Sequence, residues 1–101
     1  MLLVYVTCDN REEARSIAKG IVGKKIAGCV NYFPISSFYW WKGEVIHDRE
    51  FALIIKSSKN NFKAIEKYVR EHHSYERPCI ISLNVSDVTP VFLKWLTNIQ
   101  K

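Results

Sequence analysis

The chain has 101 residues, of which 48% are hydrophobic and 25% are charged. This is the composition of one ordinary globular domain, so intrinsic disorder is excluded, and no apolar run approaches the roughly 18 residues that a membrane-spanning helix needs. Met1 leads directly into an apolar segment without the basic region of a secretory signal. We therefore expect a soluble, cytoplasmic protein with no membrane partner.

The net charge is +5, from 15 basic and 10 acidic residues. A nucleic-acid partner would require basic residues clustered on one face among exposed aromatic residues, whereas here they are spread along the chain, so we expect no such partner. The three cysteines, Cys8, Cys29 and Cys79, are odd in number, widely spaced and without a CxxC pair. They predict reduced thiols rather than a disulfide framework.

The first elements in the chain are a strand and a helix. The segment Leu2–Cys8 is apolar on both faces, as is typical of a central strand. Asn10 is expected to cap the following helix, with Glu13 three residues later completing a capping box. The helix has one apolar stripe, made by Ala14, Ile17, Ala18, Ile21 and Val22. Gly23 and Gly28 bracket its end.

Two long strands follow, at about Ala27–Trp41 and Glu44–Lys56, joined by a tight turn at Lys42-Gly43. Pro34 removes a backbone donor in the first of them, which places that strand at an edge or a bulge. Strands usually have about five or six residues, so the aromatic run at 38–41 is expected to project beyond the core. A monomer rarely leaves so much apolar surface uncovered, which predicts an obligate homo-oligomer.

A second helix is expected from about Ser58–Asn60 to His72, with Phe62, Ile65, Val69 and His72 on its inner face. The segment Cys79–Val85 alternates like a half-buried edge strand, with Cys79, Ile81, Leu83 and Val85 on its apolar face. Thr89 then caps a C-terminal helix that begins at Pro90. The apolar face of this helix is made by Phe92, Trp95, Leu96 and Ile99.

The predicted order is βαββαβ with an additional C-terminal helix. The first and third strands are apolar on both faces and the other two have edge features, so the antiparallel sheet order is 4-1-3-2. This is an α+β, ferredoxin-like fold in a single domain over residues 1–101. An RNA-recognition domain has the same element order, but its stacking aromatics lie on the central strands, which here are rich in Leu, Val and Ile.

No catalytic signature is present, such as a Gly-rich phosphate loop or an HExxH or GxSxG motif, so we expect no enzyme. Single residues remain as candidates. Cys29 is either a small buried hydrophobe or a thiol that binds a soft metal. His72 and His73 either interact favourably with the helix dipole at the C-terminus of the second helix or act as metal ligands. Lys56 is either a lysine whose stem covers apolar surface or an anion ligand.

Five segments together resemble the CutA family of divalent-cation tolerance proteins over essentially the whole chain. They are Gly28–Asn31, Pro34–Ser37, Tyr39–Gly43, Ile54–Ser57 and His73–Pro78. The resemblance implies a fold similar to the PII nitrogen-regulatory proteins and a tight homotrimer formed through the long hairpin. It also implies a link to copper tolerance and copper binding, without a defining enzymatic activity.

The resemblance places a metal site around the two histidines and a cysteine. Cys29, His72 and His73 are the ligands that it implies, for copper or another divalent metal ion. A further cysteine of some family members falls at Val6, and Cys8 lies two residues later on the same strand face. The family often has Glu where this chain has Cys79, so a carboxylate is lost there.

Two hypotheses follow. The first is a cytoplasmic homotrimer of the CutA type that binds divalent or soft metal ions and contributes to metal tolerance. The second is a PII-like trimeric signalling or scaffold module that binds a small anion in clefts between subunits. The residues expected to line that cleft are Lys56, Tyr75, Glu76 and Trp41.

Overall fold

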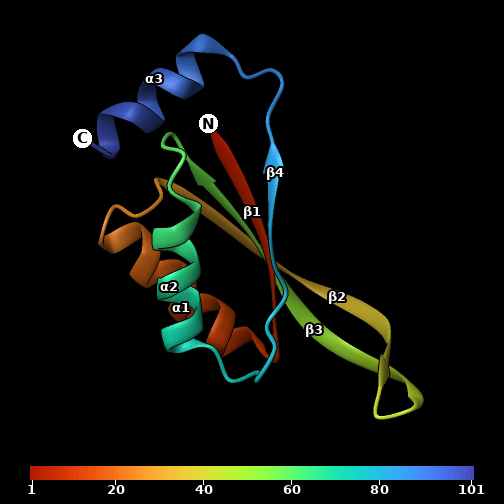
Figure 1. The fold of residues 1–101 in the computed structure, drawn as a ribbon. Coiled ribbons are helices and arrows are strands. Elements are labelled where there is room, and N and C mark those ends of the chain that lie inside the picture. Colours follow the sequence, from red (N-terminus) through yellow and green to blue (C-terminus); the bar gives the residue numbers. More distant parts are fainter.

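The computed structural model describes all residues 1–101. In chain order the elements are β1 Leu2–Cys8, α1 Arg11–Gly23, β2 Cys29–Trp41, β3 Glu44–Ser57, α2 Phe62–His72, β4 Ile80–Asn84 and α3 Pro90–Ile99. The strands form one antiparallel sheet in the order β2-β3-β1-β4. This confirms the predicted order, read from the other edge. Helices α1 and α2 lie side by side on one face of the sheet (Figure 1).

The sheet has two different faces, and β1 shows the difference best. Its even-numbered residues, Leu2, Val4, Val6 and Cys8, are buried against the helices, while its odd-numbered residues are only partly covered. The buried side chains join those of the inner stripe of α1 and of β3 and α2 in one hydrophobic core. We call the side without α1 and α2 the open face.

The β2–β3 hairpin projects far beyond the helices (Figure 1). It pairs regularly from Cys29↔Lys56 to Trp41↔Glu44. The turn at its tip has φ values of 49° at Lys42 and 80° at Gly43, the left-handed pair of a type I′ hairpin turn. Because β2 is an edge strand, the missing N–H of Pro34 breaks no ladder, as predicted.

The projecting hairpin gives the chain more surface than a folded monomer of its size has. Phe38 and Trp40 are each 74% exposed at its end. The accessible surface is 6892 Å², whereas a mass of 11.8 kDa corresponds to about 5,900 Å² in folded monomers. The radius of gyration of 14.2 Å likewise exceeds the about 13 Å of a compact chain of this length.

The C-terminal helix α3 is fixed to the end of the sheet by one buried side chain. The Gln100 amide donates to the Ile26 carbonyl and to Ser57 Oγ, at 3.1 and 3.0 Å, and its oxygen accepts from the Ser58 N–H at 2.7 Å. Close packing helps, because a Cβ at Gly28 would overlap Leu96 Cδ1. A side chain at position 28 would therefore force the buried Leu96 side chain to move.

Four local expectations were wrong. Helix α2 begins at Phe62, not at Ser58–Asn60, and His72 at its end is exposed rather than turned inward. On β4, Ile81 and Leu83 lie on the open face and are about half exposed, while Ile80 packs against the core. Thr89 makes no side-chain capping bond to α3.

No helix of the structure is both long enough and apolar enough to cross a membrane.

Candidate metal centre

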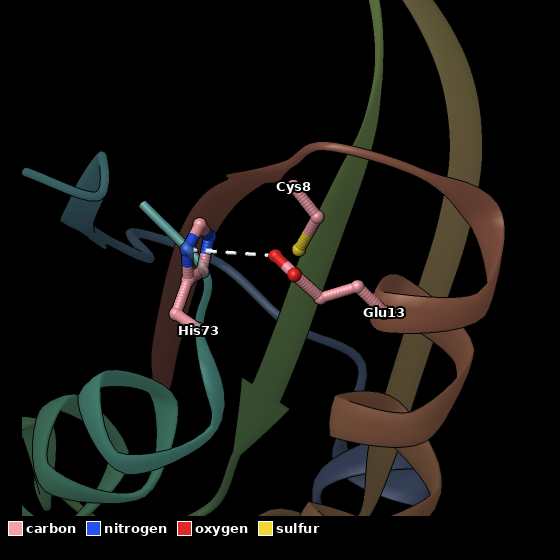
Figure 2. Close-up of side chains that lie close together, drawn as sticks. All are labelled: Cys8, Glu13 and His73. Carbon is pink, nitrogen blue, oxygen red and sulfur yellow. Dashed lines mark ion pairs between the residues drawn. The ribbon is translucent and has the colours of Figure 1, made fainter. Parts of the chain in front are cut away.

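Three elements bring Cys8, Glu13 and His73 together on the helix side of the sheet (Figure 2). Cys8 is the last residue of β1, Glu13 lies in the first turn of α1, and His73 directly follows α2. One ligand atom from each, sulfur, oxygen and nitrogen, lies within 4.8 Å of the other two. The chain contains no second group of three such donors at this spacing.

Local backbone geometry explains why these residues meet. Only residues 9 and 10 separate β1 from α1, so Glu13 remains next to the end of the strand. Asn10 caps α1 by accepting the Glu13 N–H at 2.9 Å, as predicted. The other half of the capping box is absent, because the Glu13 carboxylate turns to His73 instead. His73 has extended backbone angles, which end α2 and direct its side chain under the sheet.

Hydrogen bonds fix the tautomer of His73. Its Nε2 lies 2.7 Å from the Thr7 carbonyl, which can only accept, so Nε2 carries the proton. Its Nδ1 accepts the Tyr75 N–H at 3.0 Å. The imidazole side chain is fully buried. In the neutral ring, the lone pair of Nδ1, which now accepts the Tyr75 N–H, is therefore the one that a metal ion would take over.

The Glu13 carboxylate faces that nitrogen without a donor of its own. Glu13 Oε1 lies 3.5 Å from His73 Nδ1 and is buried without any hydrogen-bond partner. A buried carboxylate oxygen in this state is costly unless a cation or a proton compensates it. Since the neighbouring Nδ1 offers a lone pair rather than a proton, the arrangement favours a bound cation between the two groups.

The third donor, Cys8, is a neutral thiol in the metal-free protein. It is 0% exposed. Burial, together with the negative charges of Glu13 and Glu50, raises the pKa of Cys8 to about 12. A metal ion would displace the thiol proton on binding. A thiolate, an imidazole and a carboxylate together suit zinc, and the two softer donors suit copper as well.

Of the three metal ligands predicted from the sequence, His73 lies in this cluster and the other two do not. His72 stacks on Tyr68 with ring centroids 4.0 Å apart, and its Nδ1 lies 2.7 Å from the Tyr68 carbonyl. Cys29 pairs with Lys56 and Cys8 with Phe51, five residues apart on β3, so the two thiols are on opposite faces. The separation along the strand is about 17 Å.

A second concave region lies on the open face. It is a hollow of about 680 Å³, and its wall includes three of the four predicted cleft residues, Trp41, Tyr75 and Glu76. The fourth, Lys56, does not line it, and its ammonium group lies 5.8 Å from the centroid of the Phe92 ring on α3. Sequence reasoning missed Glu50, which lines the hollow and accepts the Tyr75 hydroxyl at 2.7 Å.

Comparison with known proteins gives one consistent family. The family of CutA1 divalent ion tolerance proteins matches residues 2–99. The divalent-cation tolerance protein CutA of Archaeoglobus fulgidus is 41% identical over 93 residues, which are 92% of this chain and 91% of that protein. That of Thermotoga maritima is 40% identical over 96 residues, which are 95% of each chain.

Solved structures agree in fold over the whole chain. The structure of the periplasmic divalent cation tolerance protein CutA from Archaeoglobus fulgidus superimposes with a TM-score of 0.96 at 38% identity, covering 100% of both chains. The crystal structure of CutA1 from Pyrococcus horikoshii gives a TM-score of 0.95 at 32% identity, covering 100% of this chain and 99% of that one.

Proposed function

The chain belongs to the family of CutA1 divalent ion tolerance proteins, and from this premise we propose that it binds copper or another divalent metal ion, such as zinc, through Cys8, Glu13 and His73. The observation that carries the proposal is the buried Glu13 Oε1, which has no partner and lies 3.5 Å from His73 Nδ1. The family name supports a role in metal tolerance.

Binding at this site would change two existing interactions. The ion would replace the proton of the Cys8 thiol and the Tyr75 N–H that Nδ1 now accepts. Thr7 would continue to hold Nε2, so the imidazole stays oriented with its free nitrogen toward the ion. These residues supply ligands and orientation only, which supports a metal-binding role without enzymatic turnover.

We also propose that the working form is a homotrimer. The excess of accessible surface and the exposed aromatic residues Phe38 and Trp40 at the end of the hairpin support association of several copies. The predicted ligands Cys29 and His72 would have to meet across a subunit boundary, because one chain does not bring them together. Light scattering on the purified protein gives the mass that tests the trimer.

The cytoplasmic location predicted from the sequence stays a proposal. Three free thiols support a reducing compartment, whereas the related Archaeoglobus fulgidus protein is described as periplasmic. Fractionation of cells that express the untagged protein would decide between the two compartments.

The experiment that tests the metal site is a calorimetric titration of the purified oligomer with zinc and copper under reducing conditions. His73→Gln and His72→Gln form a matched pair of neighbouring substitutions, and Cys8→Ala and Cys29→Ala form a second pair on opposite sheet faces. We expect His73→Gln and Cys8→Ala to lower the affinity by more than about 100-fold, because losing a ligand costs more than the about 10–100-fold of losing an outer-shell partner. We expect His72→Gln and Cys29→Ala to bind as the wild type does.

The opposite pattern would contradict the proposal. Loss of affinity in His72→Gln and Cys29→Ala, with Cys8→Ala unchanged, would move the site to the ligand set implied by the family resemblance. Weak binding without whole-number stoichiometry in the wild type would remove the metal site altogether.

A further inference from the structure

We propose that Glu13 is the ligand through which the metal ion enters and leaves the site, whereas Cys8 and His73 hold the ion from inside. This role rests on the metal site proposed above and concerns how the ion exchanges with solution. The three donors differ in how completely the protein covers them, and this difference assigns the roles. Such a site would pass its ion to and from small chelating molecules rather than keep it permanently.

His73 is covered on both of its nitrogens. Its side chain is 0% exposed. The Thr7 carbonyl lies 2.7 Å from Nε2, and the Tyr75 N–H donates to Nδ1 at 3.0 Å. The Tyr75 ring also lies against the imidazole, with the two centroids 4.8 Å apart. An ion that arrives from solution therefore cannot contact Nδ1 first.

Cys8 is covered as completely. Its cross-strand partner is Phe51 of β3, and the side chains of such a pair lie on the same face of the sheet. The Phe51 ring packs against the core, and the Arg11 guanidinium lies over it, 5.6 Å from its centroid. The side of the thiol toward β3 is therefore closed by an aromatic ring and by a positive charge that repels a metal cation.

Glu13 is the donor that reaches the surface. Its side chain is 14% exposed. Neither carboxylate oxygen accepts a hydrogen bond within the chain, and only Oε1 is buried. Asn10 holds the backbone N–H of Glu13 and leaves the carboxylate free to turn. One carboxylate thus offers an inner oxygen to the buried donors and an outer oxygen to solution.

This arrangement suits exchange of the ion. The outer oxygen of Glu13 is the first donor that a hydrated cation can contact. Three protein donors also leave one position of a tetrahedral zinc ion for a water or an incoming ligand. Because Cys8 and His73 are covered, a small thiol or carboxylate chelator would reach the ion beside Glu13.

Zinc-binding kinetics separate the entry ligand from the others. Zinc would be mixed by stopped flow with the purified, chelator-treated oligomer under reducing conditions, and free zinc followed with a fluorescent indicator. We expect Glu13→Gln, which removes the charge and keeps the shape, to lower the association rate constant by at least about tenfold. Glu12→Gln removes the same charge from the exposed neighbouring position and should stay within about twofold of the wild type at about 0.15 M salt.

The two covered ligands should show the opposite pattern. Cys8→Ala and His73→Gln keep the entry carboxylate, so their association rate constants should remain within about threefold of the wild type, and their loss of affinity should appear in dissociation. Glu13→Asp keeps a carboxylate on a shorter stem. We expect it to retain at least about half of the wild-type association rate constant and to release zinc faster.

Zinc release from the wild type gives a test without any substitution. The released zinc would be captured by pyridylazoresorcinol, whose absorbance reports it. Because a chelator can reach the ion beside Glu13, the release rate should rise in proportion to the chelator concentration. A rate that levels off would mean that the site must open first, and it would overturn the inference even if Glu13→Gln failed to fold.

Two outcomes of the association experiment would also overturn the inference. They are equal association rate constants of Glu13→Gln and the wild type, and an equal fall in Glu12→Gln and Glu13→Gln. A zinc affinity that still depends on Cys8 and His73 would then leave the metal-site proposal standing. A wild-type protein that binds no zinc would remove both proposals.

Discussion

The two faces of the sheet meet in β1, whose alternate residues belong to different environments. Toward the helices, Cys8 and the residues before it on that face are fully enclosed within one chain, and the Cys8–Glu13–His73 cluster is complete there. On the open face of the single chain, Ile81 and Leu83 of β4 are half exposed, and the hollow beside Glu50 is uncovered.

This difference separates the surface that one chain buries by itself from the surface that a partner subunit would have to cover. Helices α1 and α2 of the same chain cover the helix face. Its one buried side-chain atom without a hydrogen-bond partner, Glu13 Oε1, is a candidate metal ligand. The open face and the projecting hairpin leave apolar side chains in water. We therefore expect changes on the open side to act on assembly and changes on the helix side to act on the single chain.

The largest effect is expected from the hairpin. Replacing Trp40 and Trp41 together by Ser should weaken assembly by more than about 1,000-fold, because each buried Trp side chain contributes about 2–3 kcal/mol. Sedimentation over a range of concentrations would show the loss of the discrete oligomer. Trp95→Ser is the matched control, since Trp95 on α3 is 49% exposed and Trp41 is 45% exposed.

If the hairpin is not an interface, the two substitutions should behave alike. A Trp40→Ser/Trp41→Ser variant with the same mass as the wild type at all concentrations would contradict the open-face interpretation. A Trp95→Ser variant that dissociates would instead place the interface on α3.

The fold was predictable because its signals are local and repeated. The apolar residues on both faces of β1, the helical stripe of α1 and the position of Pro34 each constrain one element, and together they give the sheet order. The predicted face of β4 failed for a physical reason. An edge strand of five residues can turn its apolar side outward when another surface covers it, and no pattern within the strand shows this.

The metal site was only partly predictable, because it depends on the direction that the backbone takes where a helix or strand ends. The choice between His72 and His73 rests on where α2 ends, since the extended backbone at His73 alone turns an imidazole inward. Glu13 was expected to complete a capping box, and His73 competes for its carboxylate. The two-residue connection after Cys8 was the one sequence signal that Cys8 and Glu13 would meet.

A smaller effect concerns the buried thiol of the helix face. The pKa of Cys8 is about 12 in the folded protein, against a reference value of 9.0. The folded state therefore retains a thiol proton that the unfolded state releases, so this stabilisation is complete below pH 9 and is lost as the pH rises toward 12. From pH 8 to pH 10 the metal-free wild type should lose about 1.4 kcal/mol more unfolding free energy than Cys8→Ala.

Urea unfolding at the two pH values, with a chelator present, gives this difference directly. Cys29→Ala removes a thiol from the open face and serves as the control. Equal losses of unfolding free energy in the wild type and Cys8→Ala would mean that the Cys8 thiol is not buried on the helix face.

The smallest expected effect is a coupling between the two faces of the sheet through Tyr75. Tyr75 donates its N–H to His73 Nδ1 on the helix side and its hydroxyl to Glu50 on the open side. A metal ion on Nδ1 would displace the N–H, and the resulting shift of Tyr75 would weaken the bond from its hydroxyl to Glu50. We expect Tyr75→Phe, which lacks that bond, to bind zinc about two- to fivefold more tightly than the wild type in calorimetry, because one hydrogen bond fewer opposes the shift.

Glu50→Gln gives this last prediction an internal control, because it keeps an acceptor for the Tyr75 hydroxyl and should bind zinc as the wild type does. Tyr75→Phe keeps the ring and the N–H and removes only the hydroxyl, so a change in its zinc affinity would come from the bond on the open face. Identical zinc affinities of the wild type and Tyr75→Phe would show that the two faces act independently.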